Sequence, residues 1–171
     1  IRARLSEDGT KLDLSNLKLG DVECKCIADC EDLKNLTHLY LELNKITEKG
    51  VALLASSENL KNLTLLSLDR NEMKDAGFIS IVNSKYFSQL KVLMVENNGI
   101  TDEGIEAICE SENLSNLLRL YIEENNYTDE GFDLLGEAEH LINLTRFQAI
   151  ILSQTLKLLK KLSKRLDALL Y

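Results

Sequence analysis

The amino-acid sequence predicts an α/β solenoid, in which one strand-turn-helix unit is repeated and stacked. Three observations predict this fold: a period of 27 residues, an alternation of apolar residues early in each period, and a helical spacing of apolar residues later in it. The residues that open the pattern are Leu36, Leu63, Leu90, Leu117 and Leu144. Because one unit cannot enclose a core alone, stacked neighbours must bury its apolar side.

A further unit lies upstream, where Leu12 falls on the position of Leu39. The chain therefore holds five units and part of a sixth, and we expect the solenoid over residues 1–151. The first unit is atypical because Leu17 replaces an asparagine, and the last unit keeps only its leading apolar residues. Atypical outer units are expected where a stack is capped.

Each unit begins with a short strand that has one buried face. After the opening leucine, apolar and variable residues alternate with a period of two. Strands that are connected through helices lie parallel, so we expect one parallel sheet. The residues that follow the strands are asparagines, namely Asn44, Asn71, Asn98 and Asn125. An amide both donates and accepts hydrogen bonds, and we expect it to satisfy backbone groups where the chain leaves the sheet.

A helix follows each asparagine. Thr47, Thr101 and Thr128 are favourable N-cap residues, and the acidic residues after them suit a helix N-terminus. Apolar residues three apart then mark the inward side of each helix, such as Val51 and Leu54 in one unit. Each helix is therefore expected to pack behind its own strand, which leaves the other side of the sheet open.

The repeated pattern LxxLxLxxNxIT(D/E)xG resembles the leucine-rich repeat of the ribonuclease-inhibitor type, over about residues 9–150. Its uniform period is similar to that of repeats attached to F-box proteins, whose cysteine is replaced here by asparagine. Similar repeats also occur in effectors that intracellular bacteria inject into host cells. The resemblance implies a right-handed curved horseshoe, with parallel strands on the concave face and helices on the convex face. It also implies binding of another protein on the concave face.

The formal net charge of −8 is unevenly distributed, because the C-terminal tail is basic and the repeats are correspondingly more acidic. An acidic solenoid is disfavoured as a ligand for nucleic-acid phosphates. No apolar run approaches the roughly 20 residues of a membrane span, so membrane insertion is not expected. The four cysteines lack the spacing of a secreted disulfide scaffold, which favours reduced thiols and a cytoplasmic location, or the host cytosol for an injected effector.

The candidate binding residues face outward from the strands, because packing dictates the identity of the inward ones. They form three columns, located two, four and six residues after each opening leucine. The candidates are His38, Tyr40, Glu42, Leu65, Asp69, Val92, Met94, Glu96, Arg119, Tyr121 and Glu123. Tyr40 and Tyr121 are the expected anchors, because interface hot spots are enriched in tyrosine.

The third column contains four consecutive acidic residues, which we expect to form a ladder across the sheet. Adjacent strands lie about 4.8 Å apart. At that spacing each like-charge pair costs about 1–3 kcal/mol before the side chains splay apart. A cationic partner would relieve this repulsion, and the negative charge of the ladder would attract it. The alternative is a solvated acidic face on which isolated apolar residues have no partner.

No catalytic or metal-binding group is assembled by the sequence. The two histidines, His38 and His140, lie about four units apart and cannot readily share a site. Cys24 and Cys26 would point about 200° apart on a helix, so the cluster with Cys30 is not a structural zinc site. Cys24 occupies an inward position and is expected to be a buried thiol. We therefore expect neither enzymatic activity nor a cofactor.

The tail from 152 to 171 leaves the repeat and predicts a strongly amphipathic helix. Its apolar side holds Leu152, Leu156, Leu159, Leu162, Leu166 and Leu169, and its other side holds five basic residues. Capping of the last unit is the expected role. The alternatives are a helix that binds a partner or a membrane surface, or the first helix of a further domain.

Together these observations predict a module, monomeric by itself, that binds a partner protein with a basic or enzymatic surface. An inhibitor or regulator that blocks a partner enzyme is the more concrete version. The alternative is a scaffold or substrate-recognition segment of a larger multidomain protein.

Overall fold

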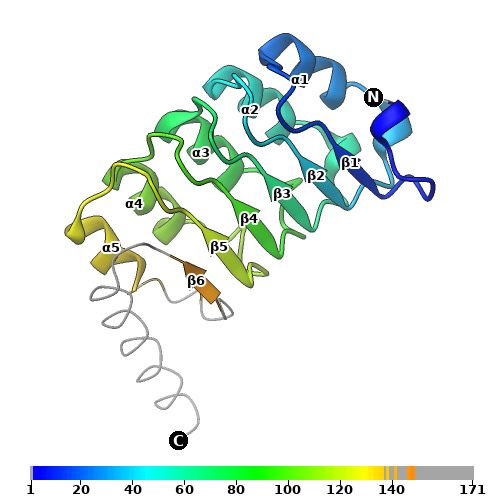
Figure 1. Ribbon diagram of the computed structural model, residues 1–171. Coiled ribbons are helices and arrows are strands. Elements are labelled where there is room, and N and C mark those ends of the chain that lie inside the picture. The colour runs from blue at the N-terminus through cyan, green and yellow to red at the C-terminus, as the bar shows by residue number, and fades with distance from the viewer. Residues whose placement is uncertain (1, 137, 139–140, 142–145, 149–171) are drawn as a thin grey trace, which may run out of the picture.

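The computed structural model describes residues 2–136, 138, 141 and 146–148, which form a stack of strand-helix units (Figure 1). The strands are β1 (Lys11–Asp13), β2 (His38–Tyr40), β3 (Leu65–Ser67), β4 (Val92–Met94), β5 (Arg119–Tyr121) and β6 (Arg146–Gln148). They pair in parallel and in chain order as one six-stranded sheet. Leu12 pairs with Leu39 and Leu39 with Leu66, so the sequence period is also the register of the sheet.

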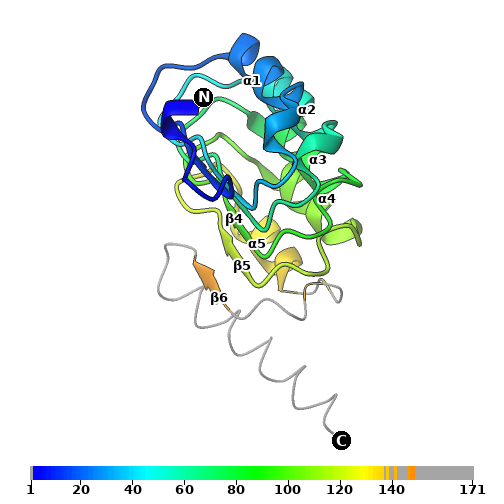
Figure 2. The ribbon, with the colours of Figure 1, turned by 90° about the vertical axis from the view of Figure 1, so that its right-hand side faces the viewer.

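The α-helices all lie on one side of this sheet, as Figures 1 and 2 show. They are α1 (Asp21–Ala28), α2 (Glu48–Ala55), α3 (Lys74–Val82), α4 (Asp102–Glu110) and α5 (Asp129–Leu135), with short 3-10 turns η1 (Arg2–Arg4), η2 (Glu31–Leu33) and η3 (Glu58–Leu60). No described helix covers the other side of the sheet. The predicted α/β solenoid is confirmed, whereas the predicted capping helix over 152–171 lies outside the described residues.

The core lies between the sheet and the helices. Leu39, Leu66 and Leu93 point inward from the centres of successive strands and are fully buried. Phe78 and Phe87 are the largest fully buried side chains and fill the third unit. Because each of the first five units contributes to one continuous cluster, their stack is held mainly by apolar burial between neighbours.

The asparagines satisfy backbone groups at the ends of the strands, as predicted. The Asn71 amide donates to the carbonyl oxygens of Leu41, at 3.0 Å, and Leu68, at 2.9 Å. Its carbonyl oxygen accepts the N–H of Ile46 at 3.0 Å. Since Leu41 and Ile46 belong to the preceding unit, the asparagine joins neighbouring units. The amides of Asn44, Asn98 and Asn125 bridge in the same way.

The predicted N-caps are also confirmed, and they form a second link between units. Thr101 accepts the N–H of Glu103 at 3.4 Å. The Thr101 backbone N–H and hydroxyl donate to the two carboxylate oxygens of Asp75, at 2.8 and 2.9 Å. Thr47 and Thr128 make the same bonds to aspartates of the preceding helices. In the third unit Lys74 stands in the threonine position, and α3 begins without a side-chain cap.

Candidate partner-binding face

The candidate residues lie together on the side of the sheet that no described helix covers, which is called the strand face below. Sheet register places His38, Leu65, Val92 and Arg119 side by side in the first column. It places Tyr40, Ser67, Met94 and Tyr121 side by side in the second. The third column, called the acid column below, follows the strands and holds Glu42, Asp69, Glu96 and Glu123. All the predicted site residues except Glu123 are at least partly accessible to solvent.

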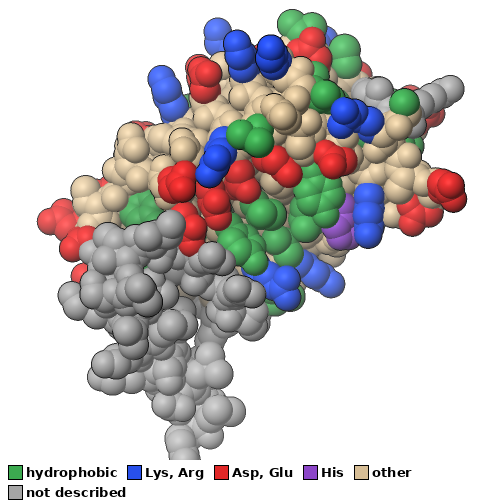
Figure 3. Space-filling model, viewed as in Figure 1, with side chains coloured by type: hydrophobic (Ala, Val, Ile, Leu, Met, Phe, Trp, Pro, Cys, Tyr) green, Lys and Arg blue, Asp and Glu red, His purple; other side chains and the backbone are tan. Residues whose placement is uncertain are grey.

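Large apolar side chains occupy the middle of the strand face. Tyr40, Leu65, Val92, Met94 and Tyr121 are each partly exposed, whereas the inward leucines between them are fully buried. Figure 3 shows hydrophobic side chains gathered over the strands next to a band of acidic ones. An open sheet face with contiguous apolar surface is typical of an interaction site.

His38 lies at one end of this apolar surface. Its ring centroid is 6.5 Å from that of Tyr40, and its Nδ1 lies 2.8 Å from the Thr37 hydroxyl. Burial, with a contribution from the Lys11 charge, lowers the pKa of His38 below its usual value. The imidazole is therefore neutral at pH 7 and extends the aromatic surface of Tyr40 instead of adding charge.

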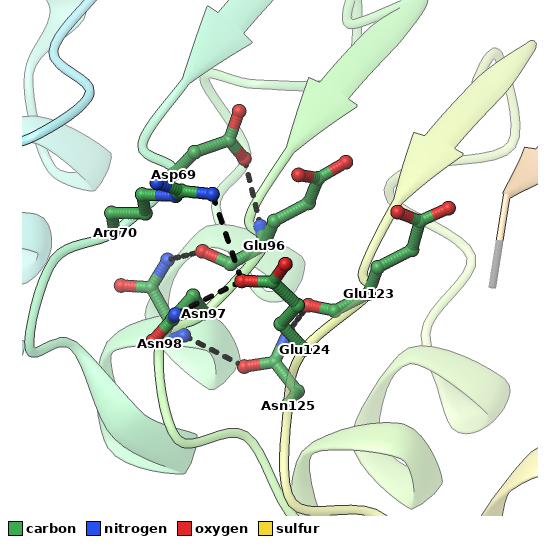
Figure 4. Close-up of polar contacts among 8 residues, drawn as sticks. All are labelled: Asp69, Arg70, Glu96, Asn97, Asn98, Glu123, Glu124 and Asn125. Atoms are coloured by element: carbon green, nitrogen blue, oxygen red, sulfur yellow. Dashed lines mark hydrogen bonds and ion pairs between the residues drawn. The ribbon is translucent and has the colours of Figure 1, made fainter. Parts of the chain in front are cut away.

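The first two acids of the third column are held by groups of the neighbouring strand. The Ser67 hydroxyl donates to Glu42 Oε2 at 2.9 Å. Asp69 Oδ1 accepts the backbone N–H of Glu96 at 2.7 Å (Figure 4). Burial raises the pKa of Asp69 to about 6; the hydrogen bond from Glu96 opposes this shift, and the charges of Glu96 and Glu42 add to it. Asp69 is therefore ionised at pH 7 at a cost to the fold.

Glu123 differs from the prediction of an exposed fourth acid, because only 6% of it is accessible. It lies at the end of the strand face beside Tyr127, whose pKa is raised to about 12 by burial and further by the Glu123 charge. The spacing of the repeat places Glu123 in the acid column but does not indicate how deeply its surroundings enclose it. The accessible part of the acid column is therefore Glu42, Asp69 and Glu96.

A polar network beyond the acid column was not predicted. Glu124 accepts a hydrogen bond from the Asn97 amide at 3.1 Å and lies 3.8 Å from an Arg70 nitrogen (Figure 4). All three residues have left-handed backbones, with φ of 55° at Arg70, 50° at Asn97 and 53° at Glu124. They share one position of the repeat, directly after the acid column. The shared position in the repeat could have indicated that these three side chains lie close together. The repeat pattern does not indicate that their backbones are left-handed.

Basic side chains border the opposite edge of the strand face. Lys11 and Arg119 belong to the first column, and Lys91 directly precedes Val92; all three are exposed. The strand face thus has acids along one edge and apolar side chains in the middle. On the other edge, Lys91 borders the first column, and Lys11 and Arg119 lie on either side of its uncharged members. Figure 3 shows this order of red, green and blue across the strands.

Among the described residues, no three histidine, cysteine, aspartate or glutamate residues are grouped so that they could hold a metal ion. Cys24 is buried, as predicted, and burial raises the pKa of its thiol to about 12, with added contributions from the charges of Asp21 and Glu23. Within the described part of the chain, no helix is long and apolar enough to cross a membrane.

Comparison with known proteins supports the leucine-rich-repeat fold. A family model described as a leucine-rich repeat matches residues 32–55 and 89–109, which hold β2 with α2 and β4 with most of α4. The chain folds as a leucine-rich-repeat solenoid. No curated protein sequence gives a significant match.

Three solved structures resemble this leucine-rich-repeat solenoid. An internalin (inlF) from Listeria monocytogenes is 26% identical with a TM-score of 0.51, over 78% of this chain and 35% of the internalin. Internalin C2 from the same species is 27% identical with a TM-score of 0.54, over 82% of this chain and 51% of the internalin. The actin-binding site 2 of leiomodin-1 is 17% identical with a TM-score of 0.59, over 85% and 89% of the two chains. This chain thus spans about half or less of the length of either internalin.

Replacement of Asp69 by asparagine is expected to stabilise the protein at pH 8. Asparagine keeps an acceptor for the Glu96 N–H but removes the buried charge. The folded pKa lies above the unfolded value, so the folded state binds more protons between about pH 4 and 6, and stability falls as pH rises through that window. After a discount for solvent screening, we expect a gain of about 1–2 kcal/mol at pH 8 and almost none at pH 4.

Urea unfolding of both proteins at the two pH values measures this effect. Glu106→Gln, which removes an exposed charge from α4, is the control and is expected to change stability little at either pH. A loss of stability in Asp69→Asn at pH 8 would contradict the assignment of Asp69 as a costly charge.

Proposed function

We propose that this leucine-rich-repeat solenoid binds a partner protein through its strand face and catalyses no reaction itself. One observation carries the proposal: the helices cover only one side of the sheet, and the other side presents contiguous, partly exposed apolar side chains. Tyrosine and methionine are enriched at interfaces. Tyr40, Met94 and Tyr121 occupy one column of the sheet and are the proposed anchors.

The acid column supports a partner with a basic surface. Burial and the charges of two neighbouring carboxylates raise the free energy of the ionised Asp69, and together they outweigh the hydrogen bond from Glu96. Natural proteins retain such destabilising groups where function requires them. A lysine or arginine of a partner would offset the repulsion and steer the encounter.

Within this function we propose the role of an inhibitor or regulator of the ribonuclease-inhibitor type. An acidic face that docks over the basic cleft of an enzyme would exclude its substrate. We propose further that the protein is effector-like and acts in the cytosol of a host cell. Its solenoid resembles those of two internalins from Listeria monocytogenes. The name of the leiomodin-1 segment, an actin-binding site, is consistent with protein binding by this fold.

The second candidate is a scaffold or substrate-recognition segment of a larger multidomain protein. In the two internalins a similar solenoid forms part of a longer chain, since this chain covers 35% and 51% of them. The same strand face would then recruit a partner for an activity located elsewhere. A complete reading frame that encodes further domains would favour this candidate over an inhibitor.

Capture from lysates tests the proposed function. We expect the double variant Tyr40→Ala, Tyr121→Ala to capture at least about tenfold less partner than the wild type does, because hot-spot tyrosines contribute most of an interface's binding energy. Both side chains are only partly buried, so the variant is expected to fold, which circular dichroism would verify.

The matched control is Lys49→Ala, Glu106→Ala, which truncates two exposed residues of the helical side. It should retain the partner as the wild type does. Equal retention by the tyrosine variant would place the binding site away from the strand face.

A further inference from the structure

The dimensions of the strand face select the kind of segment that it binds. Along the sheet, the acid column repeats once per strand, from Glu42 to Asp69 to Glu96. Strand spacing is about 4.8 Å, so two steps span about 10 Å. Any partner segment that runs across the strands must present its cationic groups at close to this interval.

An α-helix meets this interval and an extended chain does not. One helical turn rises about 5.4 Å, so side chains one turn apart differ from the strand spacing by about 0.6 Å. Side chains on one side of an extended chain are about 6.6–6.8 Å apart, which exceeds the spacing by about 2 Å at every step. Over the three accessible acids the error accumulates to about 1 Å for a helix and about 4 Å for an extended chain. Flexible lysine and arginine side chains absorb the first error with less distortion than the second.

The width of the strand face fits one helix. The first and third columns are four residues apart along the chain, as His38 and Glu42 are, and an extended chain covers about 13 Å over that distance. A helix with its side chains is about 10–12 Å wide. A single helix that lies across β2 to β5 therefore contacts all three columns, and two helices side by side would not fit.

The charges of the two edges specify the helix further. Its apolar stripe would face Tyr40, Met94 and Tyr121 in the central column. One flank would face Glu42 and Glu96 and carry lysine or arginine, and the other flank would face the basic edge and carry acidic or neutral residues. Because the two edges differ in sign, they also fix the direction in which the helix lies.

We infer that the strand face binds one amphipathic α-helix of a partner protein, which lies across the strands with a row of lysine or arginine against Glu42, Asp69 and Glu96. This inference rests on the proposed function and adds the shape and charge of the bound segment. The inference also assigns different roles to two columns of the strand face. The central column contributes apolar contact area, and the acid column fixes the position of the helix along the sheet.

Two synthetic peptides of identical composition test the inference with the full-length chain. Both contain leucine, lysine, glutamate and alanine. One is stapled as a helix with a leucine stripe, a lysine flank and a glutamate flank, and the other places leucine and lysine at a period of two. By fluorescence anisotropy we expect the helical peptide to bind at least about tenfold more tightly, because only its charges match the strand spacing.

The double variant Glu42→Gln, Glu96→Gln is expected to bind the helical peptide about tenfold more weakly than the wild type does, because two charge contacts are lost. Glu103→Gln, Glu106→Gln, which removes two exposed acids from α4, is the matched control and should bind as the wild type does. Equal affinity for the two peptides would overturn a helical ligand, and equal binding by the strand-face variant would overturn the charge register.

The outcome for the proposed function is separate. If lysate capture depends on Tyr40 and Tyr121 but the helical peptide does not bind, the strand face is an interface and the inference about a helix is wrong. If capture is independent of these tyrosines, the proposed function itself fails. Concentration-dependent self-association of the chain that Glu42→Gln, Glu96→Gln abolishes would assign the strand face to a second copy and overturn the inference.

Discussion

Replacement of Asn71 by alanine is expected to lower the free energy of unfolding by about 2–6 kcal/mol. The substitution leaves the buried N–H of Ile46 without a partner and removes one of the two side-chain hydrogen bonds from each of the carbonyls of Leu41 and Leu68. An unsatisfied buried group costs about 1–3 kcal/mol, and each lost hydrogen bond costs about 0.5–1.5 kcal/mol. Because Leu41 and Ile46 belong to the neighbouring unit, the loss weakens the stacking of the solenoid as well as one turn.

Denaturant unfolding monitored by circular dichroism measures this loss. Asn71→Asp keeps the shape of the side chain but replaces the two donor hydrogens with an acceptor, so it should be at least as destabilising as alanine. Asn126→Ala, at an exposed position, should stay within about 0.5 kcal/mol of the wild type. A well-tolerated Asn71→Asp would show that the amide does not donate as described.

Reversal of charge in the acid column is expected to abolish partner binding. The variant Glu42→Lys, Glu96→Lys places two cations where a basic partner surface docks, and like-charge contacts at an interface cost several kcal/mol. We expect affinity for the captured partner to fall by about 100-fold or more. The wild-type affinity should also decrease as salt is added, because ions screen the accessible acids.

Isothermal titration with the purified partner measures the change. Glu103→Lys, Glu106→Lys makes the same charge change on α4 and should leave affinity close to that of the wild type. If both double variants weaken binding equally, the partner responds to net charge alone and the acid column is not a specific contact.

The architecture could be predicted from the sequence because each structural requirement recurs at the same interval. Leu39, Leu66 and Leu93 are in register, so the period of 27 in the sequence is the same period as in the sheet. The asparagine amides and the threonine caps were predictable for a related reason. Their hydrogen bonds lie within one turn or reach only the adjacent unit, and the residue type determines whether a side chain can donate or accept a hydrogen bond.

The strand face could be predicted only in part. The alternation of residues shows that Glu42 and Glu123 both point away from the core, but it does not show that Glu123 is nearly enclosed while Glu42 is accessible. Exposure at a given position depends on the side chains of neighbouring units, which vary. The left-handed backbone at Arg70 and Glu124 was missed because neither residue type favours it and glycine does not occupy these positions.

The ionised Asp69 lowers the stability of the fold and, in the proposed function, also contributes to partner binding. A fold selected for stability alone would have a neutral side chain at this position, since an amide oxygen can also accept the Glu96 N–H without a buried charge. The expected gain in stability of Asp69→Asn at pH 8 should therefore be accompanied by weaker partner binding. This exchange of stability for function is typical of interaction and active sites.

Site-specific photocrosslinking shows directly whether the strand face contacts the partner. A benzophenone amino acid is placed at Tyr40, Met94 or Tyr121 on the strand face and, as a control, at Glu106 on α4, and each protein is irradiated in lysate. We expect the strand-face positions to crosslink one common partner and Glu106 not to crosslink it. A partner crosslinked from Glu106, with none from the three strand-face positions, would show that the strand face is not the binding site.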